Sequence, residues 1–420
     1  QRRGQKMTTD FATCARAAPD KMRALFEPTP LQRNAFLSDR FDCELWLKRE
    51  DLSPVRSYKI RGAFNAMGKA IADGATAFVC ASAGNHAQGV AYVARHFGVR
   101  AVIFMPVTTP RQKIDKTRVF GGDAIEVRLT GDYFDDTLAA AQAHCAQTGA
   151  RFLSPFDDDD VIEGQAAVAV EMLGQLPGPP DLIVLPVGGG GLSAGMRSYL
   201  RGQPDMAEMV LVEPTGGASL TAALHAGHPV TLPHVDTFVD GAAVGRIGDR
   251  TFAVLRDVTP DDVLLAPENR ICTTIVEMLN HEGIVLDPAG ALRLDVLPFI
   301  RDRIRGKRVV AITTGGNFDF ERLPEVKERA QRYSGVKKYM ILRLPQRPGA
   351  LRDFLEMLGP DDDSARFEYL KKSARNFGSV LIGIETSAAS NFDRLFAALE
   401  EAGFVYRDIT DDDTLAEFVI

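Results

Sequence analysis

Residues 182–195 have the sequence LIVLPVGGGGLSAG, and this stretch decides the fold class of the chain. Its first six residues form a short aliphatic run, which predicts a buried strand. The glycines that follow, Gly188, Gly189, Gly190 and Gly191, predict a tight turn from that strand into a helix. Backbone N–H groups at such a turn can bind a phosphate.

The same alternation of strand and helix extends in both directions from this stretch. Besides residues 182–187, we predict strands at residues 78–81, 101–105, 124–129, 209–212 and 308–312. Helical spacing covers residues 132–148 and 289–304, and Pro298 should kink or break the second helix. Strands that alternate with helices predict an α/β fold with a largely parallel sheet.

Two shorter segments lie outside this alternation. Residues 157–160 are four aspartates, which we expect to form a solvated loop that opens a helix at Glu163. Residues 1–6 precede Met7, and we assign them no regular structure.

The pattern changes after Arg332, where residues 333–335 predict a linker. Beyond it we predict strands at residues 339–344, 366–369, 380–385 and 405–409, and helices at 349–358 and 392–402. This βαββαβ order is typical of a ferredoxin-like domain. The chain is therefore expected to have a larger domain at residues 7–332, built from two α/β subdomains, and a smaller one at 336–420.

Composition and charge exclude several classes of protein. Of the 420 residues, 45% are hydrophobic and 25% are charged, and the formal net charge is −7. An acidic chain without a basic patch is a poor partner for nucleic acid or for an anionic membrane surface. No apolar run approaches the roughly 18 residues of a membrane span. Because the charge favours neither nucleic acid nor a membrane surface, a small molecule is the expected ligand. The five cysteines are widely spaced, so we expect reduced thiols in the cytoplasm.

A lysine stands at the start of a predicted helix in residues 57–63, SYKIRGA. A lone lysine in a loop is usually a solvated surface charge. At a buried helix start, however, both burial and the helix dipole disfavour the ammonium form. A neutral amine can form an imine with an aldehyde, so Lys59 is a candidate attachment site for a carbonyl cofactor.

A second polar segment, SAGNH, follows a predicted strand and opens a helix. Backbone N–H groups and short polar side chains at a helix N-terminus suit a carboxylate. The candidate carboxylate cradle consists of Ser82, Ala83, Gly84, Asn85 and His86. The competing interpretation is a serine N-cap with a packed asparagine. For His86 we expect a hydrogen-bonded residue rather than a metal ligand, because the other histidines show no ligand spacing.

The glycine run has two further interpretations. Residues 189–194 also satisfy the G-x-G-x-x-A dinucleotide pattern, and Glu213 closes the next strand as a ribose-binding acid would. A tight turn that lets helix and strand approach closely needs no ligand. A fourth segment, TTGGN at residues 313–317, again places small polar groups beyond a strand end, where α/β sheets bind ligands. Pyridoxal phosphate carries both an aldehyde and a phosphate, so it accounts for the lysine and the glycines together.

These four segments, in this order, resemble the fold-type II pyridoxal-phosphate enzymes of the tryptophan synthase β-like group, and within it the biosynthetic threonine dehydratases. The resemblance runs from about Thr29 to the C-terminus. Further similar segments in the larger domain are KREDL at 48–52, GNHAQG at 84–89, VEP at 212–214 and DGA at 240–242. In the smaller domain, LPQRPGAL at 344–351, GPDDD at 359–363 and FEY at 367–369 resemble one ACT-like regulatory unit.

The resemblance implies a role for each matched position. Lys59 would bind pyridoxal phosphate covalently, and Asn85 would contact its ring hydroxyl. The phosphate would be surrounded by Gly188, Gly189, Gly190, Gly191 and Leu192. Thr314 would lie at the pyridine nitrogen, where the family usually has a serine. A hydroxyl cannot hold that nitrogen protonated as a carboxylate can, which favours rapid β-elimination over a long-lived carbanion.

Three positions depart from the patterns of related enzymes. Asp287 replaces a usual glutamate, which shortens any reach toward the cofactor. Ala83 stands where serine racemases have a second acid/base serine, so racemisation is not expected. Ser219 stands where the racemase metal site has an acid, so we predict no divalent metal site.

The activity that the resemblance implies is elimination from L-threonine, and from L-serine, to 2-oxobutanoate or pyruvate and ammonia. This is the first committed step of isoleucine biosynthesis. Lys59 would remove the α-proton as general base, and the β-hydroxyl would leave with help from the cofactor phosphate. The smaller domain would bind isoleucine as feedback inhibitor, with valine as a further candidate effector, and the enzyme would be a homotetramer. We expect the effector near Arg347, Pro348, Gly349, Leu351, Phe354, Phe367 and Tyr369.

Three other classes of function share parts of this pattern. A β-replacement enzyme such as a cysteine synthase would have the same cofactor cradle without the C-terminal domain. A non-catalytic amino-acid sensor would have the C-terminal domain without needing Lys59. A NAD-dependent dehydrogenase would use the glycine run alone.

Overall fold

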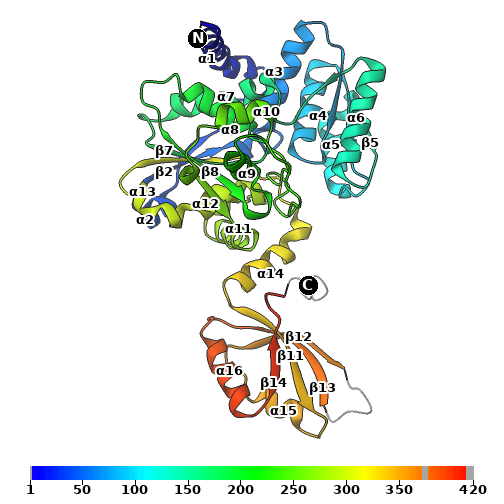
Figure 1. Ribbon diagram of the computed structural model, residues 1–420, viewed down its shortest axis with the longest axis vertical. Coiled ribbons are helices and arrows are strands. Elements are labelled where there is room, and N and C mark those ends of the chain that lie inside the picture. Colours follow the sequence, from blue (N-terminus) through cyan, green and yellow to red (C-terminus); the bar gives the residue numbers. More distant parts are fainter. Residues whose placement is uncertain (1, 371–376, 413–420) are drawn as a thin grey trace. The chain divides into compact units, whose positions relative to one another are not determined.

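The computed structural model describes residues 2–370 and 377–412. It divides into two compact units, which we describe separately (Figure 1). The larger unit consists of Gln1–Glu268 and Gly283–Phe318, and the smaller one of Asn269–Glu282 and Asp319–Ile420. The predicted division at residues 7–332 and 336–420 stays a prediction, because a helix from the middle of the chain groups with the C-terminal unit.

The larger unit is built around a six-stranded sheet with the order β1-β2-β10-β7-β8-β9. Its strands are β1 (Leu31–Arg33), β2 (Glu44–Arg49), β7 (Leu182–Pro186), β8 (Glu208–Pro214), β9 (Val263–Ala266) and β10 (Arg308–Thr313). Only the edge pair β1 and β2 is antiparallel, and all other neighbours are parallel. The predicted strands at residues 182–187, 209–212 and 308–312 are thereby confirmed.

A second, fully parallel sheet has the order β5-β4-β3-β6. Its strands are β3 (Ala77–Ala81), β4 (Arg100–Met105), β5 (Ile125–Leu129) and β6 (Arg151–Phe152). The predicted strands at residues 78–81, 101–105 and 124–129 correspond to β3, β4 and β5. The α/β class with largely parallel sheets is therefore correct.

Helices cover both faces of these sheets. In the larger unit they are α1 (Arg2–Met22), α2 (Ala35–Phe41), α3 (Lys59–Ala72), α4 (Asn85–Phe97), α5 (Arg111–Gly121), α6 (Phe134–Thr148), α7 (Asp159–Gln175), α8 (Gly191–Leu200), α9 (Ser219–Ala226), α10 (Asp249–Leu255), α12 (Pro288–Asp295) and α13 (Arg301–Ile304). On the six-stranded sheet, α7 and α8 lie on one face and α12 on the other (Figure 1). Because both faces are covered, the central strands are apolar at successive positions.

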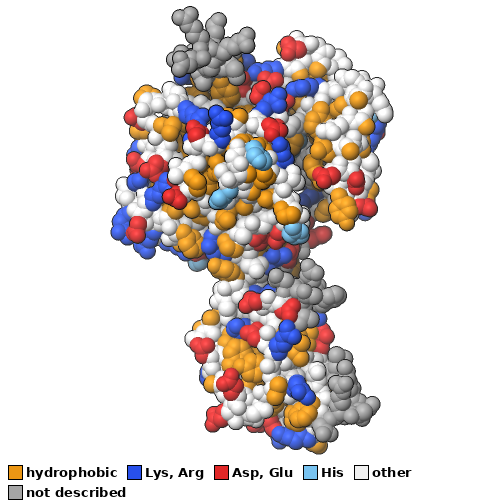
Figure 2. All heavy atoms as spheres, in the orientation of Figure 1, with side chains coloured by type: hydrophobic (Ala, Val, Ile, Leu, Met, Phe, Trp, Pro, Cys, Tyr) orange, Lys and Arg blue, Asp and Glu red, His pale blue; other side chains and the backbone are white. Residues whose placement is uncertain are grey.

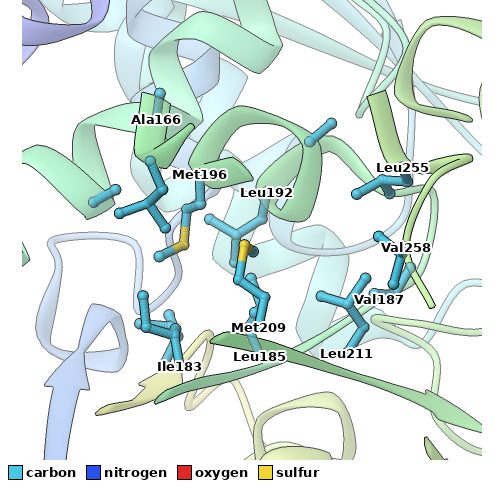
Figure 3. Packing of buried hydrophobic residues seen from close by; sticks show 14 of the residues in the cluster. Ala166, Ile183, Leu185, Val187, Leu192, Met196, Met209, Leu211, Leu255 and Val258 are labelled. Carbon is cyan, nitrogen blue, oxygen red and sulfur yellow. The ribbon is translucent and has the colours of Figure 1, made fainter. Parts of the chain in front are cut away.

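The core between β7, β8 and the helices is formed by alternate strand residues. Ile183 and Leu185 point toward Leu192 and Met196 of α8, together with Leu211 of β8 (Figure 3). All five side chains are at most 2% exposed. This packing fixes α8 against the strand from which its glycine turn emerges.

The smaller unit contains one antiparallel sheet with the order β12-β13-β11-β14. Its elements are α14 (Leu323–Tyr333), β11 (Lys337–Pro345), α15 (Ala350–Leu355), β12 (Asp363–Leu370), β13 (Phe377–Glu385), α16 (Asn391–Glu401) and β14 (Val405–Asp408), with most of α11 (Glu268–Glu282). The βαββαβ order from β11 to β14 confirms the predicted ferredoxin-like arrangement.

Two local expectations were wrong, and a third was right. Residues 2–6 belong to α1, although we assigned them no regular structure. The aspartates at 157–160 are not a simple solvated loop, because α7 begins at Asp159 and Asp158 caps it by accepting from the N–H groups of Asp160 and Val161. The helix expected at residues 289–304 breaks before Pro298, as predicted, and continues as a 3₁₀ turn and α13.

The surface carries both signs of charge. On the face shown in Figure 2, Lys and Arg side chains alternate with Asp and Glu over both units. Within the described residues, every helix is too short or too polar to cross a membrane.

Candidate active site

Lys59 is the first residue of α3, as the sequence predicted. Its Nζ donates a hydrogen bond to the carbonyl oxygen of Pro155 at 2.7 Å. Burial lowers the pKa of the Lys59 ammonium group to about 8. A substantial fraction of this amine is therefore neutral at physiological pH, which an imine-forming lysine requires.

The segment at residues 313–317 lies beside the segment of Lys59. Tyr58 donates its N–H to the carbonyl oxygen of Thr314 at 3.1 Å, and Ser57 pairs with Gly315 in an antiparallel bridge. The Thr314 side chain is 4% exposed, and its Oγ1 has no hydrogen-bond partner among the described residues. A buried hydroxyl without a protein partner is available to a ligand, and the family resemblance implies that this hydroxyl lies at the ring nitrogen of the cofactor.

The SAGNH segment occupies the position expected for a carboxylate cradle, between β3 and the first turn of α4. Ser82 is not the N-cap of α4. The cap is Gly84, without a side-chain bond to the helix, and the Ser82 Oγ accepts from the Gly84 N–H at 3.2 Å. Ala83 lies between them, and the first N–H groups of α4 cannot form helical bonds of their own.

The His86 side chain is buried and structural. Its Nε2 donates to the carbonyl oxygen of Leu153 at 3.0 Å. Burial, together with the charge of Lys59, lowers the pKa of His86 to about 3, so the imidazole is neutral. The expectation of a hydrogen-bonded residue rather than a metal ligand is consistent with these contacts.

Asn85 connects the cradle to the segment of Thr314. Its Oδ1 accepts a hydrogen bond from Asn317 Nδ2 at 2.6 Å, and Asn317 also donates to the carbonyl oxygen of Val55 at 2.8 Å. The Nδ2 of Asn85 lies 3.5 Å from Asp287 Oδ2. Three of the four predicted segments, namely residues 57–63, 82–86 and 313–317, therefore lie next to one another.

The glycine turn lies between β7 and α8. Gly190 has a φ of 88°, a conformation that favours glycine, and it is the residue before α8. A Cβ at Gly189 would lie 2.2 Å from the ring of Phe156, and a Cβ at Gly188 would lie 3.0 Å from the Cα of Ala242. Leu192 directs its side chain into the core (Figure 3), so only its backbone can face a phosphate.

Sequence reasoning missed the segment that connects the turn to the lysine. Residues 153–157, LSPFD, follow β6. The carbonyls of Leu153 and Pro155 accept from His86 and Lys59, and the Phe156 ring packs on the glycine turn. Asp157 accepts from the N–H groups at the start of α10, including that of Arg250 at 2.8 Å. The sequence signal that could have identified residues 153–157 is their position directly after a parallel strand, where α/β sheets bind ligands.

Two further titratable groups belong to this site. Lys116 of α5 donates to Asn317 Oδ1, and burial lowers its pKa. Asp287 caps α12 by accepting from the N–H of Gly290 at 2.6 Å, and burial raises its pKa to about 6. Asp287 therefore reaches the site despite its short side chain. Lys116 is a second lysine whose role must be separated from that of Lys59.

The structure does not support the dinucleotide interpretation, because the expected ribose-binding acid, Glu213, has another role. Glu213 is fully buried and accepts from the N–H groups of Leu220 at 2.6 Å and Thr221 at 2.9 Å, and from the Thr221 hydroxyl at 2.7 Å. It therefore caps α9, whose first residue is Ser219, and has no oxygen directed at a ribose. In the described part of the chain, no cluster of three His, Cys, Asp or Glu residues could hold a metal ion.

The residues predicted to bind an effector are dispersed over the smaller unit. Phe354 is fully buried in its core, and its expected place in the lining of an effector pocket stays a prediction. Three of the others, Leu351, Phe367 and Tyr369, are each about 40% exposed. Pro348 and Gly349 precede α15. Arg347 forms an ion pair with Asp353 at 2.6 Å. A cavity of about 160 Å³ in this unit is lined by Arg343, Pro345, Arg347, Phe377 and residues 402–405. Arg347 is the one predicted residue that lines this cavity.

Two family profiles match the sequence. The profile of the pyridoxal-phosphate dependent enzymes matches residues 22–315. The profile of the C-terminal regulatory domain of threonine dehydratase matches residues 328–419. Together they span both units of the structure.

Two biosynthetic L-threonine dehydratases are similar to this protein over almost the whole chain. The biosynthetic L-threonine dehydratase IlvA of Bacillus subtilis (strain 168) is 46% identical over 395 residues, 93% of each chain. The corresponding protein of Lactococcus lactis subsp. lactis (strain IL1403) is 42% identical, over 96% of this chain and 98% of its own.

Solved structures with a similar fold include a threonine deaminase and a serine racemase. The processed form of threonine deaminase isoform 2 from Solanum lycopersicum is 35% identical, with a TM-score of 0.72, over 77% of this chain and 94% of its own. The serine racemase of maize is 25% identical, with a TM-score of 0.68, over 76% and 98%.

Proposed function

The chain belongs to the pyridoxal-phosphate-dependent threonine dehydratases, and we propose that it converts L-threonine to 2-oxobutanoate and ammonia. L-Serine would give pyruvate in the same way. This reaction would commit carbon to isoleucine. The single observation that carries the proposal is the position of Lys59, whose buried amine donates to the Pro155 carbonyl at 2.7 Å, next to Phe156, whose ring packs on the glycine turn.

The residues present fit the cofactor. Thr314 offers a buried hydroxyl without a protein partner to a ring nitrogen, and Lys59 offers an amine to an aldehyde. The turn from Gly188 to Gly191 offers backbone N–H groups to a phosphate at the start of α8. Asn85 would contact the ring hydroxyl. When bound, pyridoxal phosphate supplies an aldehyde carbon and a conjugated ring that withdraws electrons from the substrate α-carbon.

In this proposal the chain contributes binding and proton transfer. The N–H groups at the start of α4 bind and orient the substrate carboxylate. Lys59 Nζ is the general base that accepts the α-proton. The Pro155 carbonyl orients this amine through the 2.7 Å hydrogen bond. Ala83 offers no group for proton transfer on the opposite face, so elimination without racemisation is expected.

The attachment site can be tested by chemistry. Borohydride reduction of the purified yellow protein, followed by peptide mapping, should find the cofactor on Lys59 and not on Lys116. Lys59→Ala should abolish turnover, whereas Lys116→Ala should keep the cofactor attached. Adduct formation on Lys116, or none at all, would overturn the assignment.

The reaction can be tested by its products. With L-threonine we expect equal amounts of 2-oxobutanoate and ammonia, and with L-serine pyruvate without accumulating D-serine on chiral chromatography. Efficient use of sulfide with an activated serine would favour a β-replacement enzyme instead.

The C-terminal unit matches a regulatory domain, and an amino-acid effector is the natural ligand of that domain in this proposal. We propose isoleucine, with valine as a further candidate. Two candidate sites for the effector can be compared by substitutions in the full chain. Tyr369→Ala tests the residues predicted from sequence, and Arg343→Ala tests the cavity, where the Arg343 guanidinium lies 5.1 Å from the Phe377 ring centre. The variant with the larger rise in the inhibitory isoleucine concentration identifies the site, and no rise in either would contradict both.

We further propose a homotetramer in the cytoplasm. The five cysteines, which form no disulfide within the described residues, agree with a reducing compartment. Light scattering of the purified holoenzyme measures the assembly directly, and a monomeric mass would exclude it.

A further inference from the structure

The orientation of the Asn317 side-chain amide is fixed by two neighbours, Val55 and Lys116. Its Nδ2 donates to the Val55 carbonyl oxygen at 2.8 Å, and its Oδ1 accepts from the Nζ of Lys116. A backbone carbonyl can only accept a hydrogen bond, and a lysine ammonium group can only donate. A reversed Asn317 amide would therefore place two acceptors together at Val55 and two donors together at Lys116.

This orientation determines that of the Asn85 amide. The same Nδ2 of Asn317 lies 2.6 Å from Asn85 Oδ1. Because an amide nitrogen donates, the Asn85 atom that faces it must be the carbonyl oxygen. The NH2 group of Asn85 therefore points away from Asn317, and its Nδ2 lies 3.5 Å from Asp287 Oδ2. Burial raises the pKa of Asp287 to about 6, so this carboxyl is mostly ionised at neutral pH and favours the same orientation.

The NH2 group of Asn85 lies beside the strand end that belongs to the candidate active site. A Cβ at Gly315 would be 3.3 Å from Asn85 Nδ2. Gly315 follows Thr314 and pairs with Ser57, two residues before Lys59. An NH2 group has two hydrogens, so besides the one toward the carboxylate a donor remains for a ligand.

We propose that Asn317 is a positioning residue of the cofactor site, which turns the NH2 group of Asn85, and not its carbonyl, toward the ring oxygen of bound pyridoxal phosphate. The inference rests on the proposed function, which places Asn85 at the ring hydroxyl. Lys116 holds Asn317 in this orientation from α5, so this second lysine of the site serves to position the ring. An N–H donor favours the ionised form of the ring oxygen, whereas a carbonyl in its place would repel it.

The test is the absorption spectrum of the reconstituted holoenzyme. The bound cofactor absorbs visible light when its ring oxygen is ionised and near-ultraviolet light when that oxygen is protonated. Asn317→Leu removes the amide and leaves the charge of the site unchanged. We expect it to lower the ratio of the visible to the near-ultraviolet band at neutral pH, and to weaken cofactor binding about tenfold in equilibrium dialysis. Asn317→Ser, whose hydroxyl ends closer to the backbone, should do the same, so the test does not depend on the folding of one variant.

A double-mutant cycle shows whether Asn317 acts through Asn85. Asn85→Leu should lower the band ratio and the cofactor affinity at least as much as Asn317→Leu. The variant that carries both substitutions should then be no worse than Asn85→Leu alone, because no Asn85 amide remains to be oriented. Arg118→Met is the matched control on α5, where the Arg118 side chain is 58% exposed, and it should change neither readout.

Two results would overturn the positioning role. If the effects of the two single substitutions multiply in the double variant, Asn317 acts independently of Asn85. If Asn317→Leu and Asn317→Ser lower the melting temperature while their spectra follow wild type, Asn317 is only structural. A wild-type protein that forms no adduct at Lys59 would instead overturn the proposed function, before any variant is compared.

Discussion

At the scale of single residues, the site depends on one amine whose protonation is set by burial. With a pKa of about 8, Lys59 is neutral in about a tenth of the molecules at pH 7, roughly 300-fold more than an ordinary lysine. The rate at which apoprotein rebinds pyridoxal phosphate should therefore rise with pH and level off above a midpoint near 8. Stopped-flow absorbance measures this rate, and a midpoint above pH 10 would show that Lys59 is not perturbed.

The glycine turn allows a second test of single residues. In Gly189→Ala the new methyl would lie 2.2 Å from the Phe156 ring. We expect the ring and the turn to move apart, with a loss of about 1–3 kcal/mol in the free energy of unfolding and at least tenfold weaker cofactor binding. Gly174→Ala is the control, because it adds a methyl to open space in α7 and should stabilise the protein by up to about 1 kcal/mol. Wild-type cofactor affinity in Gly189→Ala would contradict a role of this turn.

The site residues that could be predicted from the sequence are those whose chemistry is recognisable from their immediate neighbours in the chain. Lys59, Asn85, the glycines and Thr314 each follow or precede a recognisable strand or helix, and the structure brings them together. Pro155 and Phe156 could not be identified, because Pro155 contributes a backbone carbonyl, which every residue has, and Phe156 contributes a ring whose contact with the glycine turn appears only in the tertiary structure.

At the scale of elements, the close approach of α7 and α8 positions the glycine turn. A Cβ at Gly195 of α8 would lie 2.3 Å from the carbonyl oxygen of Ile162 in α7, which is backbone and cannot rotate away. Gly195→Ala should therefore separate the helices and cost about 1–3 kcal/mol of stability. Gly68→Ala in α3 is the matched control, since its methyl would make only an ordinary 3.5 Å contact with Phe97. Chemical denaturation of both variants measures the difference, and equal stabilities would refute close packing here.

Element order was predictable because buried parallel strands appear in the sequence as short continuous apolar runs. In the smaller unit, whose sheet is antiparallel, apolar runs likewise indicated the βαββαβ order, and the break near Pro298 followed from the proline itself. The exact first residues of helices could not be predicted. At the start of α7, for example, Asp158 is the N-cap, but each of the neighbouring aspartates has the same preference for that position. The grouping of α11 with the C-terminal unit could not be predicted, since it depends on contacts between distant segments.

At the scale of the whole molecule, the question is whether regulation can be removed without removing catalysis. A chain that ends at Ser334 would keep every residue of the candidate active site. It would lose β11, whose Lys337 binds Glu385 of β13 at 2.8 Å and also Glu328 of α14, and it would lose the Thr410 carbonyl that Arg332 contacts. The truncated chain should therefore melt at a lower temperature than the full chain.

Its activity should nevertheless persist without a response to isoleucine. Feedback inhibition requires that isoleucine bind a less active arrangement more tightly, and couplings of about 1 to 3 kcal/mol would change threonine affinity roughly 5- to 150-fold. Removing the sheet of the C-terminal unit removes the proposed effector site, so the apparent threonine affinity should no longer depend on isoleucine. Initial rates over a range of threonine concentrations, with and without isoleucine, measure this dependence in both chains, and circular dichroism checks folding. Inhibition of the truncated enzyme at the same isoleucine concentration would place the effector in the catalytic pocket, because no other predicted isoleucine site would remain.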